Sequence, residues 1–522
     1  MSMTEACSNR RTSVTTQIIL FLGLAAVVPW AGCSREEPKS ETKSQPFPIT
    51  LAVKETSLGK LPSGTRQGEL KVSPDNSHLA YSVQRGTNWS VILDGSEQEQ
   101  YSEVRDLVFS PDSRHLAYAV RRGPAAMIVL DGKEGPTFNV VAQGLEVFSP
   151  DSQHLAYVAW LGSNWVAVLD GNPGRAYERI GKSGITFSPD SQHLAYPAMR
   201  AKDSFMVVDG KEGLLCEGTG PFRFSPDGRH TGYMVPKGES WLVVVDEQTN
   251  EFPVVVTNGV IFSPDSQRYL YAAGPTNGPL GVFLNGKKTA EFDSIGAGGL
   301  AFSPNSKHVA VSGKRGHEWR VELDGHASPA YDGVMANSLT FSPDGEHLAY
   351  AALRGNRWFV VNDGKEGAGF EGIVSDTVVF SPDSKQLGYL AGRSKSFIAV
   401  VDGLESAAPG AYSVIFSPDS RRFAYMSGQG TNWHVVVDGK PGKSYNGIAI
   451  RPCAFSPDSQ HFWYVASRAG KYILVVDDKE SKPYDQVVID PTPTSTFTPF
   501  QVLTVNADGK GGQEYFRVVA EH

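Results

Sequence analysis

The sequence predicts an all-β protein made of tandem β-propellers, with about twelve four-stranded blades. The first observation behind this prediction is the tripeptide Ser-Pro-Asp, once changed to Ser-Pro-Asn, which occurs eleven times at intervals of 36 to 40 residues. The second is that the segments between the tripeptides contain β-forming residues and turn signals but no helical stretch. The third is a fixed spacing of 19 residues, in ten of the eleven copies, from the end of the tripeptide to the Asp that begins a second turn. The third residues of the tripeptides are Asp75, Asp112, Asp151, Asp190, Asp227, Asp265, Asn305, Asp344, Asp383, Asp419 and Asp458.

The third copy shows how four strands follow from its residues. Residues 145–149 form an apolar first strand, and the Ser-Pro-Asp turn that follows has Pro at the position where a fixed φ is favourable. Residues 154–159 alternate large and small side chains and predict the second strand. Residues 165–169 predict the third, and the Asp-Gly pair after them suits a tight hairpin that needs positive φ. A less regular fourth strand is expected near residues 176–180.

Length variation is confined to one part of the repeat. From the Asp-Gly hairpin to the next Ser-Pro-Asp turn, the spacing ranges from 17 residues (Asp402 to Asp419) to 20 residues (Asp438 to Asp458). This part holds the fourth strand and the crossover to the next blade, on the side where insertions in repeat proteins often bind ligands. Because the variation is only three residues, no blade carries a long excursion.

The run FSPDSQHLAY, at residues 148–157 and again at residues 187–196, resembles the WD40-like (PD40) repeat of the TolB-type propellers of bacterial envelopes. The resemblance covers about residues 67–490 and implies a β-propeller fold, but it implies no particular ligand. Two departures limit it. TolB-type proteins carry an α/β domain before a six-bladed propeller, and this chain has no such segment. The chain also has no Trp-Asp dipeptide, so the hydrogen-bond network of eukaryotic WD40 repeats is not implied.

Eleven copies exceed the four to eight blades of an ordinary propeller. A twelfth blade is predicted from strands at residues 497–500, 501–507 and 513–520, completed by the N-terminal segment 47–53, which would hide two open edges. We expect two six-bladed rings, residues 47–297 and residues 298–522, that meet near the Gly-rich segment 295–299. A division into seven and five blades is the alternative.

The N-terminal residues predict export. Two arginines, Arg10 and Arg11, precede an apolar run of thirteen residues, which has the length of a signal peptide and is too short to span a bilayer. The run ends in Trp-Ala-Gly-Cys and resembles a bacterial lipoprotein signal, which is cut before a cysteine that is then lipidated. The resemblance makes residues 1–32 a signal peptide and Cys33 the lipidation site. A plain secretory signal is the alternative.

The residues after Cys33 predict how the protein is attached. Residues 33–46 are polar and charged and predict a disordered tether. Lipoproteins kept in an inner membrane typically carry Asp directly after the lipidated cysteine. Since this chain has Ser34 there, the resemblance favours an outer membrane of the bacterial envelope.

Charge and cysteine content exclude some classes of function. Loss of two Arg and one Glu with the signal peptide moves the formal net charge from −8 to −9, which argues against broad affinity for nucleic acid. Cys216 and Cys453 lie in distant copies and in different strands of the repeat, so we expect free thiols and no disulfide framework, with a disulfide between them as the alternative.

Two recurrent side chains are expected to be structural. Aromatic residues at the fourteenth place after the turn, six of them Trp, are expected to pack between blades, with a ligand-stacking role as the alternative. Histidine stands three residues after the turn Asp or Asn in eight copies. A metal needs several ligands that converge on one ion, and equivalent positions on separate blades do not converge, so we expect no metal site there. The histidines are His78, His115, His154, His193, His230, His308, His347 and His461, and the tryptophans are Trp89, Trp165, Trp241, Trp319, Trp358 and Trp433.

A basic residue at the tenth place is the candidate binding feature. It stands at the tip of the hairpin between the second and third strands, on the face that carries the crossovers and opposite the Ser-Pro-Asp turns. We therefore expect one basic and one acidic face, with the basic face as a docking surface for an acidic envelope protein or an anionic glycan. The alternative is a set of independently solvated tips. The candidate partner-binding residues are Arg85, Arg122, Arg200, Lys237, Arg315, Arg354, Arg393 and Arg468.

Motifs of known enzyme classes are missing from the sequence. It contains no G-x-S-x-G, C-x-x-C, H-E-x-x-H, P-loop or EF-hand pattern. We therefore expect a binding or scaffolding module without catalysis, metal or other cofactor. The alternative is a hydrolase or lyase that acts on an envelope glycan or a small lactone in the central channel. A non-repeating cluster of Asp, Glu and His near the channel would favour this alternative.

Overall fold

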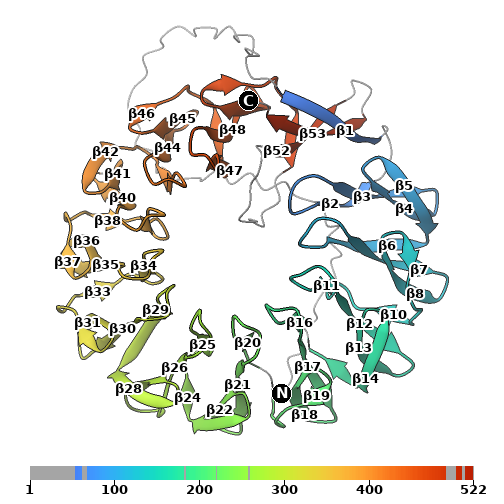
Figure 1. Cartoon of the computed structure of the whole chain (residues 1–522), viewed down its shortest axis with the longest axis horizontal. Coiled ribbons are helices and arrows are strands. Elements are labelled where there is room, and N and C mark those ends of the chain that lie inside the picture. Colours follow the sequence, from blue (N-terminus) through green and yellow to red (C-terminus); the bar gives the residue numbers. More distant parts are fainter. Residues whose placement is uncertain are drawn as a thin grey trace, which may run out of the picture. The chain divides into compact units, whose positions relative to one another are not determined.

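The computed structural model describes residues 53–61, 67–181, 184–218, 220–256, 259–394, 396–488, 501–507 and 512–520. In these residues every regular element is a β-strand, and the strands form twelve antiparallel sheets (Figure 1). The prediction of an all-β propeller with twelve four-stranded blades is confirmed. The predicted signal peptide, Cys33, the tether and the strand at residues 497–500 lie outside the described residues.

Each blade follows the same strand order, from the first strand at the inner side of the cycle to the fourth at the outer side (Figure 1). The first strands, five of them in two segments, are β2 (Gln67–Val72), β6 (Glu103–Phe109), β10 (Val140–Val141) with β11 (Val147–Phe148), β15 (Arg179–Ile180) with β16 (Thr186–Phe187), β20 (Phe222–Phe224), β24 (Val254–Val255) with β25 (Ile261–Phe262), β29 (Ser294–Phe302), β33 (Gly333–Val334) with β34 (Thr340–Phe341), β38 (Gly372–Ile373) with β39 (Val379–Phe380), β43 (Tyr412–Phe416), β47 (Gly447–Phe455) and β51 (Gln486–Val488).

The second and third strands pair on both sides. The second strands are β3 (Leu79–Arg85), β7 (Leu116–Arg122), β12 (Leu155–Leu161), β17 (Leu194–Arg200), β21 (Thr231–Lys237), β26 (Tyr269–Gly274), β30 (Val309–Arg315), β35 (Leu348–Arg354), β40 (Leu387–Arg393), β44 (Phe423–Gln429), β48 (Phe462–Arg468) and β52 (Gln501–Ala507). The third strands are β4 (Asn88–Leu93), β8 (Ala125–Leu130), β13 (Asn164–Leu169), β18 (Asp203–Val208), β22 (Ser240–Val245), β27 (Leu280–Leu284), β31 (Glu318–Leu323), β36 (Arg357–Asn362), β41 (Ser396–Val401), β45 (Asn432–Val437), β49 (Lys471–Val476) and β53 (Gln513–Ala520).

The fourth strands have one neighbour and a free outer edge, and six of them are only two residues long, which limits edge-to-edge pairing with other chains. They are β5 (Ser96–Tyr101), β9 (Lys133–Glu134), β14 (Asn172–Tyr177), β19 (Lys211–Glu212), β23 (Gln248–Phe252), β28 (Lys287–Phe292), β32 (His326–Ala327), β37 (Lys365–Glu366), β42 (Leu404–Ala407), β46 (Lys440–Pro441), β50 (Lys479–Glu480) and β1 (Val53–Leu61).

The recurrent tripeptide builds a turn that also joins neighbouring blades. In the third blade the Ser149 hydroxyl donates to Asp151 Oδ1 at 2.5 Å and accepts from the backbone N of His154 at 2.9 Å. The next residue, Ser152, has a φ of 66°, and its Oγ accepts from the backbone N of Asp112 in the preceding blade at 3.0 Å. The same contact to the preceding turn occurs in eight of the repeats, whereas Gly228 and Gly345 stand at this place in two others, so the repeat specifies contacts between most blades as well as the turn itself.

The twelfth blade is assembled from both ends of the described chain. Its sheet has the order β51, β52, β53, β1, with Val53 opposite Ala520 and Leu61 opposite Gln513. The prediction that an N-terminal segment supplies the fourth strand is confirmed, and the described strand is Val53–Leu61, which shares only its first residue with the predicted segment 47–53. The first strand of this blade is β51, which pairs with β52, whereas the strand predicted at residues 497–500 lies outside the described residues.

The hydrophobic core is divided into twelve clusters, and each cluster lies between two successive blades. One cluster packs Leu58 of blade twelve against Tyr81 of blade one, and another packs Phe292 of blade six against Val311 of blade seven. The blades therefore follow one another in one closed cycle (Figure 1).

This cycle corrects the predicted division into rings of residues 47–297 and 298–522. Phe47–His522 is one compact unit, and the expected boundary lies inside β29. The Gly-rich segment 295–299 belongs to this strand and contains an irregularity in its pairing with β30. The interface between blades six and seven is a packed core like the others. The number of blades in a cycle depends on the small angle between successive blades, which no local sequence pattern reports.

Candidate functional site

The predicted partner-binding residues lie at the ends of the second strands, away from the Ser-Pro-Asp turns, as expected. Each of the eight forms an ion pair with a glutamate of its own blade, and in six blades the glutamate follows twelve residues later. Arg85 Nε lies 3.0 Å from Glu97 Oε1 and Arg468 Nη1 lies 2.9 Å from Glu480 Oε2. The other pairs are Arg122–Glu134, Arg200–Glu212, Lys237–Glu251, Arg315–Glu322, Arg354–Glu366 and Arg393–Glu405. The carboxylates therefore offset the positive charges that the sequence places on this face.

Six of these arginines also stack on an aromatic ring of the preceding blade. We call the Arg and Glu of one blade, together with this ring, the interblade latch. In blade two, Arg122 lies 5.1 Å from the centroid of Tyr101, whose hydroxyl donates to Glu134 at 2.9 Å. The same stacking occurs at Arg200 on Tyr177, Arg315 on Phe292, Arg354 on Tyr331, Arg393 on Phe370 and Arg468 on Tyr445. Such cation–π contacts stabilise the packing of two blades and give the recurrent cations a structural role. The docking role predicted for them stays a proposal.

The histidines are structural, as expected. In the third blade His154 Nδ1 lies 2.7 Å from Asp170 Oδ2, and Asp170 Oδ1 accepts from the backbone N of Leu155 at 2.9 Å. This Asp belongs to the Asp-Gly hairpin, so the contact ties the two turns at one end of the blade. The same pairs are His78–Asp94, His115–Asp131, His193–Asp209, His230–Asp246, His308–Asp324, His347–Asp363 and His461–Asp477. Within the described residues no group of three or more His, Cys, Asp or Glu side chains has the arrangement of a metal site.

The structure also tests the predictions made for the tryptophans and for the two cysteines. Trp165, Trp241, Trp319 and Trp358 are partly buried and pack against interblade clusters, which confirms the packing role for these four. Cys216 and Cys453 do not form a disulfide, as expected. Among the residues that the structure describes, no helix has the length and apolar character needed to cross a membrane.

A charged cluster on the first strands of blades one to three was not anticipated. Glu69 of β2 accepts from the backbone N of Leu107 at 3.2 Å. In blade two Arg105 pairs with Asp106, and its Nη2 donates to the backbone O of Val141 at 2.6 Å. Asp106 has a φ of 55°, an uncommon backbone conformation for a residue other than Gly. We call Glu69, Arg105, Asp106 and Glu146 the inner-strand cluster.

Glu146 is the unusual member of this cluster. It stands five residues before the turn Asp, where the other ten copies have an aliphatic, aromatic or Cys side chain. Its Oε1 is shielded from solvent and has no hydrogen-bond partner. Burial, followed by the negative charge of Asp106, raises the pKa of Glu146 to about 7. The prediction of a plain apolar strand at residues 145–149 missed Glu146, although a lone Glu among equivalent apolar positions is a visible signal.

The raised pKa of Glu146 predicts a pH-dependent stability. Because the folded pKa is above the unfolded value, the folded state loses stability as pH rises from about 4.5 to above 7, by up to about 3 kcal/mol. Glu146→Gln is expected to remove this loss, so that the variant equals the wild type near pH 4.5 and is more stable at pH 8. Urea unfolding of both proteins at pH 4.5 and pH 8 measures this difference in the free energy of unfolding. The exposed Glu178→Gln is the control, and an E146Q variant that is less stable than wild type at pH 8 would contradict the assignment.

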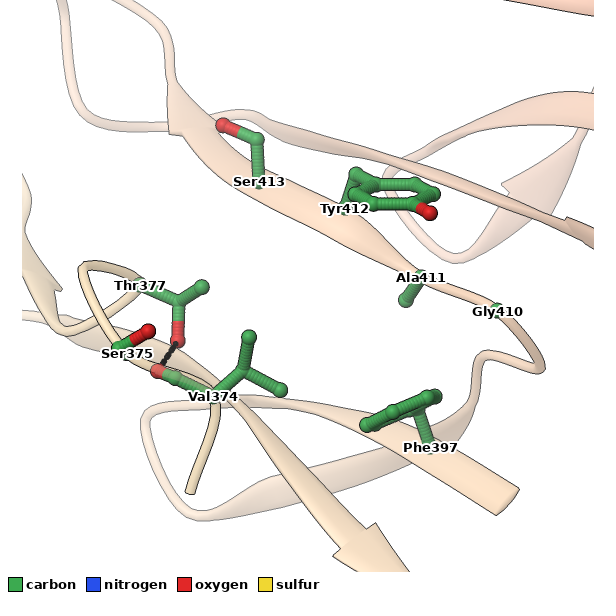
Figure 2. A pocket seen from close by; sticks show the side chains of 8 residues that line it. All are labelled: Val374, Ser375, Thr377, Phe397, Gly410, Ala411, Tyr412 and Ser413. Atoms are coloured by element: carbon green, nitrogen blue, oxygen red, sulfur yellow. Dashed lines mark hydrogen bonds between the residues drawn. The ribbon is translucent and has the colours of Figure 1, made fainter. Parts of the chain in front are cut away.

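A cavity of about 250 Å³ opens between blades nine and ten. One side is formed by Val374, Ser375 and Thr377 on the irregular first strand of blade nine, with Phe397 of β41. The other side is residues 410–413, which lead into β43 of blade ten. Figure 2 shows Val374 and Phe397 on one side and Ala411 and Tyr412 on the chain segment across from them. We call this cavity the blade 9–10 pocket.

These features define the class of protein: the described chain is a twelve-bladed β-propeller. No protein-family model matches the chain, and no curated protein sequence matches it. Among solved structures it is similar to a crystal structure of a eukaryotic initiation factor, with 17% identity, a TM-score of 0.35, and coverage of 65% of this chain and 96% of that chain. It is also similar to TolB from Acinetobacter baumannii, with 16% identity, a TM-score of 0.22, and coverage of 41% of this chain and 62% of that chain. Neither structure assigns a ligand or a partner to this chain.

Proposed function

We propose that this protein is a lipid-anchored binding or scaffolding module of the bacterial envelope, without catalysis. The observation that carries the proposal is the closed cycle of twelve similar blades, which presents the same hairpin tip many times on one face. A repeated surface suits an extended partner, such as an envelope protein or an anionic glycan. The N-terminal residues support attachment through Cys33, most simply to the outer membrane.

The hairpin tips whose basic side chains form ion pairs with glutamates, which we call the paired tips, can still serve as a docking surface. Arg85, Arg122, Arg354 and Arg393 keep between 35 and 52% of their side chains exposed. Ion pairs between exposed side chains contribute only about 0 to 1 kcal/mol, so a carboxylate or phosphate of a partner can replace the glutamate at small cost. Such a surface binds through many weak, salt-sensitive contacts that the repeat presents together.

One experiment in the envelope tests both parts of the proposal. The full chain is expected in the membrane fraction and Cys33→Ser in the soluble fraction. A partner captured by the full chain at low salt is expected to be lost at high salt and in a variant with Arg85, Arg122, Arg354 and Arg393 changed to Gln. The matched control changes their partners Glu97, Glu134, Glu366 and Glu405 to Gln. It breaks the same four pairs but keeps the cations, and it should retain the partner. Equal capture by both variants, or none by the wild type, would refute docking through this face.

The inner-strand cluster favours a second candidate function, a hydrolase or lyase that acts on an envelope glycan or a small lactone. Two neighbouring carboxyls whose pKa values are pushed apart are the usual arrangement of a general acid and a general base. Glu146, whose pKa is raised to about 7, would be partly protonated at neutral pH and act as the acid, and Asp106 would be the second carboxyl of the pair. The E146Q variant described above also serves here, because this function requires turnover by the wild type that E146Q abolishes without loss of stability.

A further inference from the structure

The interface between blades nine and ten departs from the repeat in several coordinated ways. The crossover there is the shortest in the chain, 17 residues from Asp402 to Asp419. All three members of the interblade latch are replaced. Ala408 occupies the place of the aromatic ring, since its backbone N donates to the backbone O of Phe397 as that of Phe370 does to Trp358. Gln429 ends the second strand where other blades have Arg, and Pro441 stands where Glu is expected.

Two aromatic rings at this interface are partly exposed to solvent. Phe397 pairs across the hairpin with Gly392, where blade eight has Leu353 opposite Trp358. Phe397 is therefore 40% exposed. On the other side Tyr412 is 41% exposed, although its ring packs against Trp433 with centroids 5.5 Å apart. The two half-exposed rings line the blade 9–10 pocket (Figure 2).

The lining of the pocket is apolar with a few hydroxyls and carries no charged side chain. Val374 and Ala411 add aliphatic surface, while Ser375, Ser413 and the phenol of Tyr412 add polar atoms. Burying a charged ligand here would cost desolvation without a compensating ion pair. A fully apolar ligand would bury hydroxyls without partners, which is also unfavourable. The volume is slightly below the lower end, about 300 Å³, of ordinary small-molecule sites, so it suits one ring.

We propose that the blade 9–10 pocket binds one pyranose ring of a neutral glycan. The C–H face of a sugar ring carries partial positive charge and packs on the negative face of an aromatic ring, here Tyr412 or Phe397. The hydroxyls at the rim of the sugar exchange hydrogen bonds with Ser375 and Ser413. This inference deepens the proposed function, because it rests on the protein being a binding module and names a ligand class and a site separate from the paired tips.

Saturation-transfer NMR of the folded chain with maltose, cellobiose and N,N′-diacetylchitobiose tests the inference. At least one of these sugars is expected to receive saturation at its ring C–H protons. Tyr412→Ala, which removes one platform, should weaken binding at least tenfold. Gly392→Leu, which places a leucine on the face next to Phe397 as in blade eight, should do the same without removing a ring. Leu404→Ala is the control, since Leu404 is a highly exposed apolar residue of the same blade outside the pocket.

Three results would overturn the inference: no saturation of any sugar, binding that Tyr412→Ala leaves unchanged, or tighter binding of N-acetylphenylalanine amide than of every sugar. The last outcome would make the pocket a site for an aromatic side chain of a protein. Partner capture by the Tyr412→Ala variant separates the two proposals. If the variant captures its partner but wild type binds no sugar, only the glycan inference fails.

Discussion

A chain that begins at residue 67 is expected to lose the cooperative unfolding of a chain that begins at residue 47. The shorter chain lacks β1, the fourth strand of the twelfth blade, which pairs with β53 from Val53 to Leu61. It also loses Leu58 and Leu61 from the cluster between blades twelve and one, at about 1.5 to 3 kcal/mol for each fully buried side chain. The open edge of β53 would then be free to pair with other chains. Thermal unfolding and light scattering should show a lower midpoint and aggregation.

The same truncation distinguishes one cycle from two rings. In one cycle the opened junction lies next to blade one, so blades at both ends of the chain should lose protection from hydrogen exchange. In two rings, the blades of residues 67–297 would close without β1, and proteolysis would leave a protected fragment that ends near residue 297. That fragment would contradict the single cycle. Leu58→Ser in the chain from residue 47 provides a milder form of the test if the truncated chain does not fold.

The sequence was most informative where one side chain makes its contacts within one repeat. The Ser-Pro-Asp turn, the Asp-Gly hairpin and the His154–Asp170 contact between them all follow from local spacing, so the fold class and the structural role of the histidines were predictable. Closure by an N-terminal strand was also predictable, because an incomplete last blade leaves two edges unpaired. The strand that closes it was placed a few residues too early, since a strand of mixed polarity such as VKETSLGKL has little periodic signal.

Contacts between repeats were much harder to predict. Arg122 was interpreted as a free hairpin tip because its glutamate lies twelve residues later and its aromatic partner belongs to the preceding blade. The number of blades in the cycle was predicted wrongly for a related reason, since the angle between successive blades is a property of packed interfaces. Glu146 and Ala408 were missed although each breaks a pattern at its own position. Comparison of equivalent positions across all copies, and not the search for enzyme motifs, would have found both.

The interblade latch of blade eleven differs from the others because its glutamate is buried. The side chain of Glu480 is fully shielded, whereas that of Glu134 in blade two is 31% exposed. Glu480 receives two hydrogen bonds of 2.9 Å from Arg468 and one of 3.0 Å from the Tyr445 hydroxyl. Burial acts to raise the pKa of Glu480, but the hydrogen bonds from Arg468 and Tyr445 outweigh it and hold the pKa below its usual value.

Arg468→Ala is therefore expected to destabilise the protein by about 3 to 5 kcal/mol, because it leaves a buried carboxylate without its main partner. Arg122→Ala is the matched control. It breaks an exposed pair and should cost much less than Arg468→Ala, and its lost stacking on Tyr101 matches the stacking that Arg468→Ala loses on Tyr445. Urea unfolding near pH 7 compares the two. Equal losses would show that stacking, and not the buried charge, gives the latch its strength.

The pH dependence of this difference identifies the buried charge. In the wild type the folded pKa of Glu480 is lowered, so its contribution is present above the unfolded value and is lost as pH falls through the folded pKa. In Arg468→Ala burial acts with much less opposition and the folded pKa should rise, so protonation at low pH relieves the variant. The stability gap between wild type and Arg468→Ala is therefore expected to shrink from pH 7 to pH 4. The gap for Arg122→Ala should change little, because an exposed Glu134 is solvated in both proteins. A gap for Arg468→Ala that stays constant with pH would mean that Glu480 is not the group left uncompensated.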